Sequence, residues 1–260
     1  MRDPWDPGRY ERFAEERSAP LRDLLALIRP VPGGRAVDLG CGTGALTLQL
    51  HRHVRARETV GLDSSPAMLE RARPLAGNGL RFEPGDIAAF AQDGHGGWDL
   101  VFSHAALHWV PDHPGLLARL ARALAPGGQL AVQMPANFDH PSHVLAAELA
   151  AEEPFRGALD GYRRLVPVER PERYAELLDR LGFVQQHVRL QVYGHRLPGR
   201  EEVVEWVRGT LLTDYQRRMP PELFERFLAS YRERLLPLLD ERRPCFYPFK
   251  RVLLWGGMPR

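Results

Sequence analysis

Hydrophobic positions in the first half of the chain gather into short apolar runs separated by turns and longer mixed segments. Five runs predict short buried strands, at residues 36–39, 59–62, 80–83, 98–103 and 129–134. Between them, residues 45–54, a segment that starts at Ser65 and Pro66, and residues 116–124 are typical of helices. Because strands alternate with helices, we predict an α/β fold in which helices cover both faces of a parallel sheet.

The alternation ends after Pro135. Four later segments are predicted to be helical, namely residues 141–153, 171–181, 200–212 and 221–239. Only two later segments are predicted to be strands, residues 183–193 and 251–255. We therefore expect three parts: N-terminal helices at 1–34, a ligand-binding core at 35–135, and helical cap insertions plus the last two core strands at 136–260.

Composition narrows the class of protein. The 260 residues are 44% apolar and 26% charged, which is typical of a globular protein. No apolar run approaches the roughly eighteen residues of a membrane span, and charges crowd the first twenty residues, so neither a span nor a signal peptide is predicted. Cys41 and Cys245 form no Cys-x-x-Cys pair, so we expect no disulfide framework, no metal site and a reducing cytoplasm. A net charge of +2 with mixed signs predicts no nucleic-acid partner.

Three glycines follow the first predicted strand and precede the first predicted helix. Gly40, Gly42 and Gly44 would let the backbone approach a ligand closely, because no Cβ intervenes. The same spacing also fits a dinucleotide fingerprint, with Asp63 at the right distance to hold a ribose. A tight turn without any ligand is the structural alternative.

Three aspartates lie at the ends of three successive predicted strands, where ligands of parallel sheets bind. Asp38 places a carboxylate beside the expected ligand. An anionic pyrophosphate does not need a carboxylate there, whereas a carboxylate suits a cationic ligand. Asp63 can accept hydrogen bonds from both ribose hydroxyls, and Asp86 can accept one from an adenine amino group, with Ile87 beside the ring. S-adenosylmethionine carries an ammonium and a sulfonium group but no phosphate. The pattern therefore favours S-adenosylmethionine over a nicotinamide or flavin dinucleotide.

Residues 37–44, 61–69 and 106–113 together resemble the class I methyltransferases. A more specific set resembles the trans-aconitate 2-methyltransferase family over nearly the whole chain: Trp5, Pro7, Tyr10, Phe13, Arg17, residues 132–137, residues 141–145, Trp206 and residues 249–251. This resemblance implies a Rossmann-like, seven-stranded, mostly parallel sheet and a helical cap. It also implies S-adenosylmethionine-dependent esterification of a carboxylate on a small polyacid.

The remaining expected cofactor contacts surround the glycine turn. Tyr10 and Arg17 are expected to close over the cofactor from the N-terminal helices, although ordinary helix packing is the alternative. Cys41, Ser64 and Ser103 complete the expected cofactor site, which also contains Asp38, Gly40, Gly42, Gly44, Asp63, Asp86 and Ile87. For Cys41, packing outweighs any redox role.

The acceptor is expected near the ends of the fourth and fifth strands. His108 and Trp109 follow the fourth strand and are the candidate catalytic residues, with a hydrogen-bonded structural role as the alternative for His108. The candidate substrate-binding residues are Asn137, Arg251 and Trp206. Their structural alternatives are a loop cap for Asn137, a surface strand edge for Arg251 and the cap core for Trp206. Arginine suits a carboxylate because it can bind both oxygens.

The chemistry expected here needs positioning more than acid–base catalysis. A carboxylate is ionised at pH 7, so methyl transfer to it requires no general base, but it does require close approach and a dry pocket. One alternative is methylation of a hydroxyl or carbon, with His104 or His108 as base. The others are a binding protein without catalysis and a dinucleotide oxidoreductase.

Two positions depart from the family pattern. His108 stands where glutamine is expected, and residues 211–215 replace a cap segment that carries an arginine. Thr213 takes the place of that arginine beside Asp214, so Arg217 or Arg218 is the expected substitute. We expect a small-molecule carboxylate as partner, no membrane partner, and a monomer or homodimer.

Overall fold

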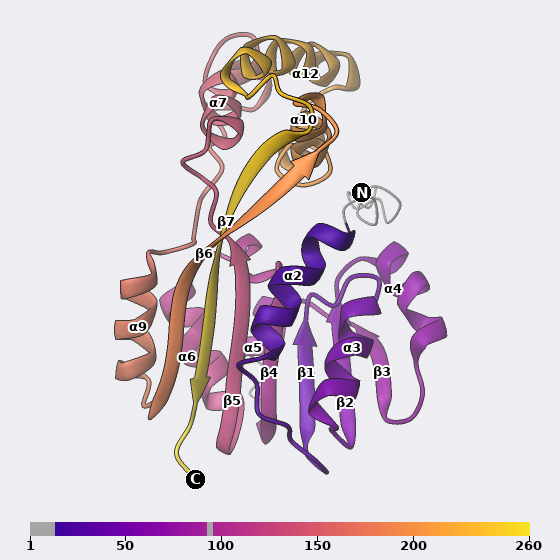
Figure 1. The fold of residues 1–260 in the computed structure, drawn as a ribbon, viewed down its shortest axis with the longest axis vertical. Helices are drawn as coiled ribbons and strands as arrows, with labels where there is room; N and C mark the ends of the chain where they lie inside the picture. The colour runs from indigo at the N-terminus through magenta and orange to yellow at the C-terminus, as the bar shows by residue number, and fades with distance from the viewer. Residues whose placement is uncertain (1–13, 93–95) are drawn as a thin grey trace. The chain divides into compact units, whose positions relative to one another are not determined.

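The computed structural model describes residues 14–92 and 96–260, which divide into two compact units (Figure 1). The core unit comprises Ala14–Ala136, Pro167–Gln191 and Lys250–Arg260. Within the described residues, the cap unit comprises Asn137–Val166 and Val192–Phe249. Strands β6 and β7 each have residues in both units.

One seven-stranded sheet runs in the order β3-β2-β1-β4-β5-β7-β6. Its strands are β1 (Arg35–Leu39), β2 (Glu58–Asp63), β3 (Leu80–Pro84), β4 (Trp98–His104), β5 (Leu124–Pro135), β6 (Gln185–Leu197) and β7 (Cys245–Gly257). Strands β1 to β5 pair with one another in parallel, and β7 is antiparallel to β5. The predicted α/β class and the mostly parallel, seven-stranded sheet are confirmed.

Helices cover both faces of the sheet in the core unit. They are α2 (Ala14–Leu25), α3 (Ala45–Val54), α4 (Pro66–Ala72), α5 (Ile87–Gln92), α6 (His113–Ala123) and α9 (Pro171–Arg180). Figure 1 shows α2 and α3 in front of the sheet and α6 behind it. Val37 and Leu39 of β1 pack in one buried cluster with Leu116 and Leu120 of α6, which fixes one layer of the core.

Capping residues account for two of these helix starts. The Ser65 side chain accepts a hydrogen bond from the backbone N–H of Met68, and Pro66 occupies the first turn, as the sequence predicts for α4. Helix α6 starts at His113, three residues before the predicted boundary, because Asp112 caps it from a left-handed backbone conformation with φ of 56°. Short 3₁₀ turns η1 (Arg73–Leu75), η2 (Leu107–Trp109) and η3 (Leu236–Leu238) join other elements.

The last two strands are longer than the sequence predicts. Strand β7 begins at Cys245 instead of residue 251 and includes Pro248, a residue that argues against a central strand. The pairing with β5 ends at Arg251, so residues 245–250 have no β5 neighbour. Proline is tolerated in a strand that lacks a neighbour on one side, and Pro248 has no β5 neighbour.

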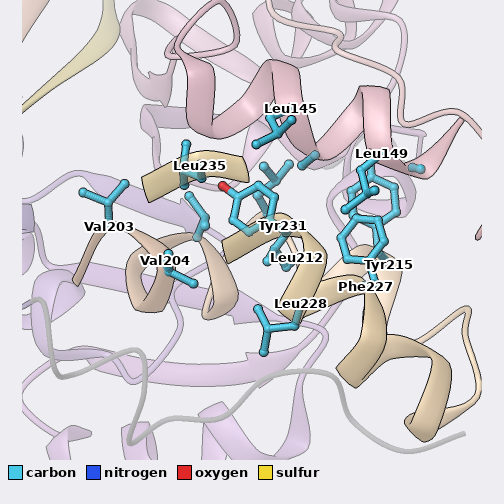
Figure 2. Close-up of a cluster of buried hydrophobic side chains, with 14 of the residues drawn as sticks. Leu145, Leu149, Val203, Val204, Leu212, Tyr215, Phe227, Leu228, Tyr231 and Leu235 are labelled. Carbon is cyan, nitrogen blue, oxygen red and sulfur yellow. The ribbon is translucent and has the colours of Figure 1, made fainter. Parts of the chain in front are cut away.

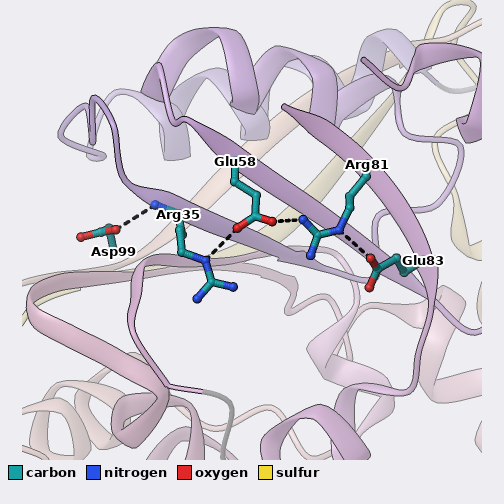
Figure 3. A network of polar contacts seen from close by, with 5 residues as sticks. All are labelled: Arg35, Glu58, Arg81, Glu83 and Asp99. Carbon is teal, nitrogen blue, oxygen red and sulfur yellow. Dashed lines mark hydrogen bonds and ion pairs between the residues drawn. The ribbon is translucent and has the colours of Figure 1, made fainter. Parts of the chain in front are cut away.

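A chain of charges links four neighbouring strands of the core unit (Figure 3). The backbone N–H of Arg35 donates to Asp99 Oδ2 at 2.8 Å, and its side chain donates to Glu58 at 2.7 Å. Glu58 also pairs with Arg81, which donates to Glu83 at 2.5 Å. Arg35 and Glu58 are the first residues of β1 and β2, so this network lies at the amino ends of those strands and leaves their carboxyl ends to other residues.

The cap unit has a hydrophobic core of its own. Its helices are α7 (Pro141–Ala150), α8 (Phe155–Ala158), α10 (Glu201–Arg208), α11 (Thr213–Gln216) and α12 (Pro221–Leu235). Figure 2 shows Leu145 and Leu149 of α7 facing Phe227 and Tyr231 of α12 in a buried cluster. The Tyr231 hydroxyl donates to the carbonyl of Ser142 at 2.7 Å, so this buried polar group has a partner. Across the described ranges, no helix has both the length and the apolar character of a membrane span.

Candidate functional site

The glycine turn after β1 contains three glycines with different surroundings. All three have positive φ, at 81° for Gly40, 55° for Gly42 and 78° for Gly44. A Cβ on Gly40 would lie 2.2 Å from the Cβ of Ala106, and one on Gly44 would lie 2.7 Å from Phe82 Cζ. A Cβ on Gly42 would meet no atom of the described residues within 4 Å. Packing therefore requires glycine at two positions, whereas Gly42 borders space that a ligand can fill.

Asp63, at the end of β2, holds the turn in place. Its Oδ2 accepts a hydrogen bond from the backbone N–H of Gly42 at 2.8 Å, and its Oδ1 accepts one from Ser65 at 2.9 Å. The N–H groups of Gly40 and Cys41 both donate to the carbonyl of Leu62, at 2.8 and 2.9 Å. These bonds place the Asp63 carboxylate beside the backbone of the glycine turn.

Asp38 is a buried carboxylate beneath the same turn. It is 2% exposed, and Oδ2 accepts a hydrogen bond from Thr47 Oγ1 of α3 at 2.7 Å. Its Oδ1 is buried with no hydrogen-bond partner among the described residues. Burial raises the pKa of Asp38 to about 7, with the charge of Asp63 adding to the rise and the Thr47 bond opposing it. A nearby cation would stabilise the ionised form and remove this cost. Thr47 was not predicted as a site residue. Its position in the first turn of the helix that follows Gly44 was the feature of the sequence that could have indicated it.

Asp86 and Ile87 lie after β3, as expected. Asp86 Oδ1 accepts from the backbone N–H groups of Ala88 and Ala89, at 2.8 and 3.0 Å, so it caps the start of α5. Asp86 is exposed and Ile87 is half-buried, which leaves both accessible at the edge of the site.

The other expected cofactor residues have different environments. Ser64 is exposed next to Asp63. Ser103 is fully buried, and its Oγ donates to the carbonyl of Leu39 at 2.7 Å, so this side chain ties β4 to β1. Burial raises the pKa of the Cys41 thiol well above its usual range. Tyr10 lies outside the described residues, and so does the side chain of Arg17.

His108 and Trp109 lie in η2, directly after β4. Their ring centroids are 4.8 Å apart, and His108 is 9% exposed. His113 holds this turn, because its Nε2 lies 3.0 Å from the Leu107 carbonyl and its Nδ1 lies 2.5 Å from the Tyr174 hydroxyl. Burial lowers the pKa of His113, which favours the neutral ring that such a bridge needs. No separate role for His113 was predicted from the sequence.

Arg251 is buried in the core unit. It is 3% exposed on β7, and its Nη1 donates to Gln133 Oε1 of β5 at 3.3 Å. The alternative of a surface position on a strand edge is therefore wrong. Arg251 therefore places a guanidinium charge in the interior of the core unit.

Asn137 and Trp206 belong to the cap unit. Asn137 is 1% exposed, and its Nδ2 lies 3.5 Å from Tyr247 Oη. Trp206 is 3% exposed, with ring centroids 4.9 Å from His195 and 5.4 Å from Phe249. Trp206 thus packs among the aromatic rings of the cap unit, and its contact with substrate stays a prediction.

The cap segment that departs from the family pattern is internally paired. Thr213 Oγ1 donates to the carbonyl of Thr210 at 2.5 Å. Asp214 is 3% exposed and pairs with Arg217, and with Arg218 at 3.4 Å. Both arginines expected to replace the missing one therefore already have a carboxylate partner. Among the described residues, no group of side chains could hold a metal ion.

Comparisons with known proteins agree with this geometry. Residues 36–128 match a family model described as "Methyltransferase domain". A trans-aconitate 2-methyltransferase of Deinococcus radiodurans is 46% identical, covering 98% of each chain, and one of Sinorhizobium fredii is 41% identical, covering 89% of each. The YcgJ protein of Bacillus subtilis has a similar fold, with a TM-score of 0.58 at 13% identity, covering 95% of this chain and 99% of its own.

A second solved structure is a phosphoethanolamine N-methyltransferase of Haemonchus contortus bound to S-adenosylhomocysteine. Its TM-score is 0.52 at 18% identity, covering 92% of this chain and 53% of that one. The sheet order, the glycine turn and these matches define a class I methyltransferase whose cofactor is S-adenosylmethionine. More narrowly, the chain belongs to the trans-aconitate 2-methyltransferase family.

Proposed function

We propose that the chain transfers a methyl group from S-adenosylmethionine to a carboxylate of trans-aconitate, giving a methyl ester. The observation that carries this proposal is the 46% identity to a trans-aconitate 2-methyltransferase over 98% of both chains, which includes the cap as well as the cofactor-binding core. A match confined to residues 36–128 would support only methyl transfer to some acceptor.

The cofactor site that we propose is built on the glycine turn. Open space beside Gly42 gives the ligand close access to the backbone. Asp63 would accept hydrogen bonds from the ribose hydroxyls, and Asp86 with Ile87 would contact the adenine. The partnerless Oδ1 of Asp38 supports compensation of the ammonium charge by this carboxylate. Cys41 would contact the cofactor through its backbone, and Ser64 would contact it at the edge of the site. Ser103 would act indirectly, because its side chain joins β4 to β1.

We propose that the residues that bind the acceptor position it and carry out little acid–base chemistry. Bound S-adenosylmethionine supplies an electrophilic methyl group, and the acceptor carboxylate is already ionised at pH 7. Arg251 would hold a carboxylate, because its guanidinium is buried on β7 and can bind both oxygens of a carboxylate. His108 and Trp109 would orient the acceptor and exclude water. Holding the two reacting groups close could lower the barrier by about 7–11 kcal/mol.

The direct test is product analysis with purified protein. S-adenosylmethionine and trans-aconitate should give S-adenosylhomocysteine and a mono-methyl ester, identified by mass and by its loss on alkaline hydrolysis. The panel of other acceptors should include citrate, cis-aconitate, a monocarboxylate and a hydroxylated non-acid. Turnover of the non-acid with none of trans-aconitate would contradict the proposed acceptor and leave the cofactor assignment intact.

Two controls separate binding from catalysis. Asp63→Ala should lose S-adenosylhomocysteine binding and all turnover together. Arg251→Gln should keep cofactor binding and lose affinity for the acceptor, by about thirtyfold or more if the guanidinium is a buried partner of a carboxylate. Equal acceptor KM in Arg251→Gln and wild type would remove Arg251 from the site.

A further inference from the structure

Residues 105–112 connect β4 to α6 and include η2, the turn that carries His108 and Trp109. Each end of this connection is a residue other than glycine in a left-handed backbone conformation, with φ of 57° for Ala105 and 56° for Asp112. This conformation is unfavourable for alanine, because its Cβ crowds the following carbonyl oxygen. Contacts from elsewhere in the core unit must therefore hold the connection in place.

A chain of hydrogen bonds joins η2 to helix α9. His113 Nε2 lies 3.0 Å from the Leu107 carbonyl oxygen, and His113 Nδ1 lies 2.5 Å from the Tyr174 hydroxyl. The backbone N–H of Glu169, just before α9, donates to the same hydroxyl at 3.0 Å. Tyr174 has no exposed surface and His113 is 2% exposed, so water does not compete for these bonds. All four residues belong to the core unit.

The two ends of this chain fix the direction of each hydrogen bond in it. The Leu107 carbonyl can only accept, so His113 donates from Nε2. A neutral ring with its proton on Nε2 accepts at Nδ1, so the Tyr174 hydroxyl donates to it. The Glu169 N–H can only donate, and the Tyr174 oxygen accepts it. Burial lowers the pKa of His113 and raises that of Tyr174, which keeps the ring neutral and the hydroxyl protonated.

The Leu107 carbonyl also closes η2 itself. It accepts the backbone N–H of Val110 at 2.9 Å, which closes the 3₁₀ turn across His108 and Trp109. A carbonyl oxygen has two lone pairs, so it can accept from His113 as well. Displacement of this carbonyl would therefore move the backbone that carries His108.

We propose that His113 and Tyr174 are positioning residues for methyl transfer, because they hold η2 in the place from which it presents His108 to the acceptor. Neither residue would touch the acceptor or the cofactor. The inference rests on the proposed function, which places His108 beside the acceptor. It also gives α9 a part in the reaction, although the first segment of the cap unit separates α9 from β4 in the sequence.

The test compares the kinetic constants of the full chain with those of Tyr174→Phe and His113→Leu. Each variant should lower kcat/KM for trans-aconitate by about tenfold or more, mainly through a raised KM, because a turn that is not held orients the acceptor poorly. The KM for S-adenosylmethionine should keep its wild-type value, because the chain of hydrogen bonds includes no residue of the glycine turn. Tyr174→Phe removes one oxygen atom and keeps the buried ring, so the test does not depend on whether His113→Leu folds.

A conservative variant distinguishes hydrogen bonding from packing. The glutamine of His113→Gln can donate to the Leu107 carbonyl through its amide nitrogen and accept from Tyr174 through its amide oxygen. It should therefore recover part of the activity that His113→Leu loses. An acceptor KM closer to wild type in His113→Leu than in His113→Gln would show that only packing matters at this position.

His51 provides a matched control, because it has the same two kinds of partner elsewhere in the core unit. Its Nδ1 lies 2.8 Å from Thr59 Oγ1, and its Nε2 lies 3.0 Å from the Asn78 carbonyl oxygen. His51→Leu and Thr59→Val should lower the melting temperature and leave the acceptor KM unchanged. An equal rise of the acceptor KM in these variants and in Tyr174→Phe would indicate general loosening and overturn the proposal.

A double variant shows whether the effect passes through His108. His108→Gln should raise the acceptor KM by itself, and Tyr174→Phe should then add less than about twofold, because the effects of coupled residues are not additive. A full further rise in the double variant would assign the effect to another route and contradict the proposal. So would a wild-type acceptor KM in both Tyr174→Phe and His113→Leu.

Hydrogen exchange separates this proposal from the proposed function. Exchange of the Trp109 and Val110 N–H groups, which donate within η2, should rise in Tyr174→Phe and not in Thr59→Val. Absence of turnover with trans-aconitate in the wild type would contradict the proposed function. Unchanged exchange in Tyr174→Phe would instead remove the role of Tyr174, whatever the acceptor.

Discussion

Gly40 and Gly42 are two residues apart in one turn, but the reasons for glycine differ. Alanine at either position would adopt an unfavourable left-handed conformation, at a cost of about 1–2 kcal/mol. Gly40→Ala adds a clash with Ala106, so it should lower the melting temperature further than Gly42→Ala.

Gly42→Ala should fold and yet bind S-adenosylhomocysteine at least tenfold more weakly, because its methyl group enters the ligand's space. Thermal unfolding and calorimetry check both; wild-type affinity in Gly42→Ala would contradict the placement of the cofactor.

Asp38 predicts a pH dependence of cofactor affinity. In the free protein its pKa is raised to about 7, so below pH 7 it is mainly protonated. An ammonium group nearby favours the ionised form, so the proton must leave on binding, and affinity should fall about tenfold per pH unit below 7. Above pH 7 affinity should level off. Calorimetric titration with S-adenosylhomocysteine between pH 5 and 8 tests this, and Asp38→Asn should give weak affinity without the slope.

The same slope in Asp38→Asn as in wild type would assign the proton to another group. Thr47→Val is a useful companion, because it removes the hydrogen bond that holds the Asp38 pKa down. In Thr47→Val, the pH below which cofactor affinity falls should therefore be higher than in wild type.

At the scale of elements, helix α12 holds the cap together through one face. Phe227 has no exposed surface, and its ring lies 5.1 Å from that of Phe155 and 5.4 Å from that of Tyr215. Phe227→Ala should cost about 3–5 kcal/mol of cap stability, because a large buried ring leaves a cavity. Hydrogen exchange of amides in α7 and α12 should rise, whereas exchange in β1 and β4 should not. Arg234→Ala, on the same helix but exposed, should leave all of these rates nearly unchanged.

Local signals in the sequence were enough to predict most elements of the core. Residues 45–54 form α3 with the predicted bounds, because a glycine turn precedes it and polar residues follow. Helix α5 went unpredicted, since its six residues are too short to show a period. The length of β7 was also missed, because Pro248 is disfavoured in a strand unless one side lacks a neighbour. That condition is set by where β5 ends and not by residues near the proline.

The residues of the candidate site also differ in whether local sequence signals could predict their positions. Asp38, Asp63 and Asp86 were predictable, because the carboxyl ends of parallel strands meet at one edge. The burial of Arg251 and the pairing of Asp214 with Arg217 were not, since each depends on a residue distant in sequence or on which helix face is covered. The bond between His113 and Tyr174 left no local signal either, because the two residues are distant in sequence.

For the whole molecule, the decisive question is whether any side chain must accept a proton during methyl transfer. If the acceptor is a carboxylate, kcat at saturating cofactor and acceptor should be nearly constant from about pH 6 to 9, because the nucleophile is ionised throughout. Only the KM for S-adenosylmethionine should rise below pH 7, through Asp38. A histidine base would instead make kcat itself fall below its reference pKa of about 6.5.

The two mechanisms also differ in their response to substitution of His108. In esterification His108 only positions the acceptor, so His108→Gln should keep most of kcat, raise the acceptor KM and leave the flat kcat profile unchanged. A base at this position would make the same variant nearly inactive, since loss of proton transfer costs about a hundredfold or more. His104→Gln serves as the parallel variant for the neighbouring buried histidine of β4. A wild-type kcat that falls below pH 6.5 and becomes flat in either variant would replace the carboxylate by a hydroxyl or carbon acceptor on the same scaffold.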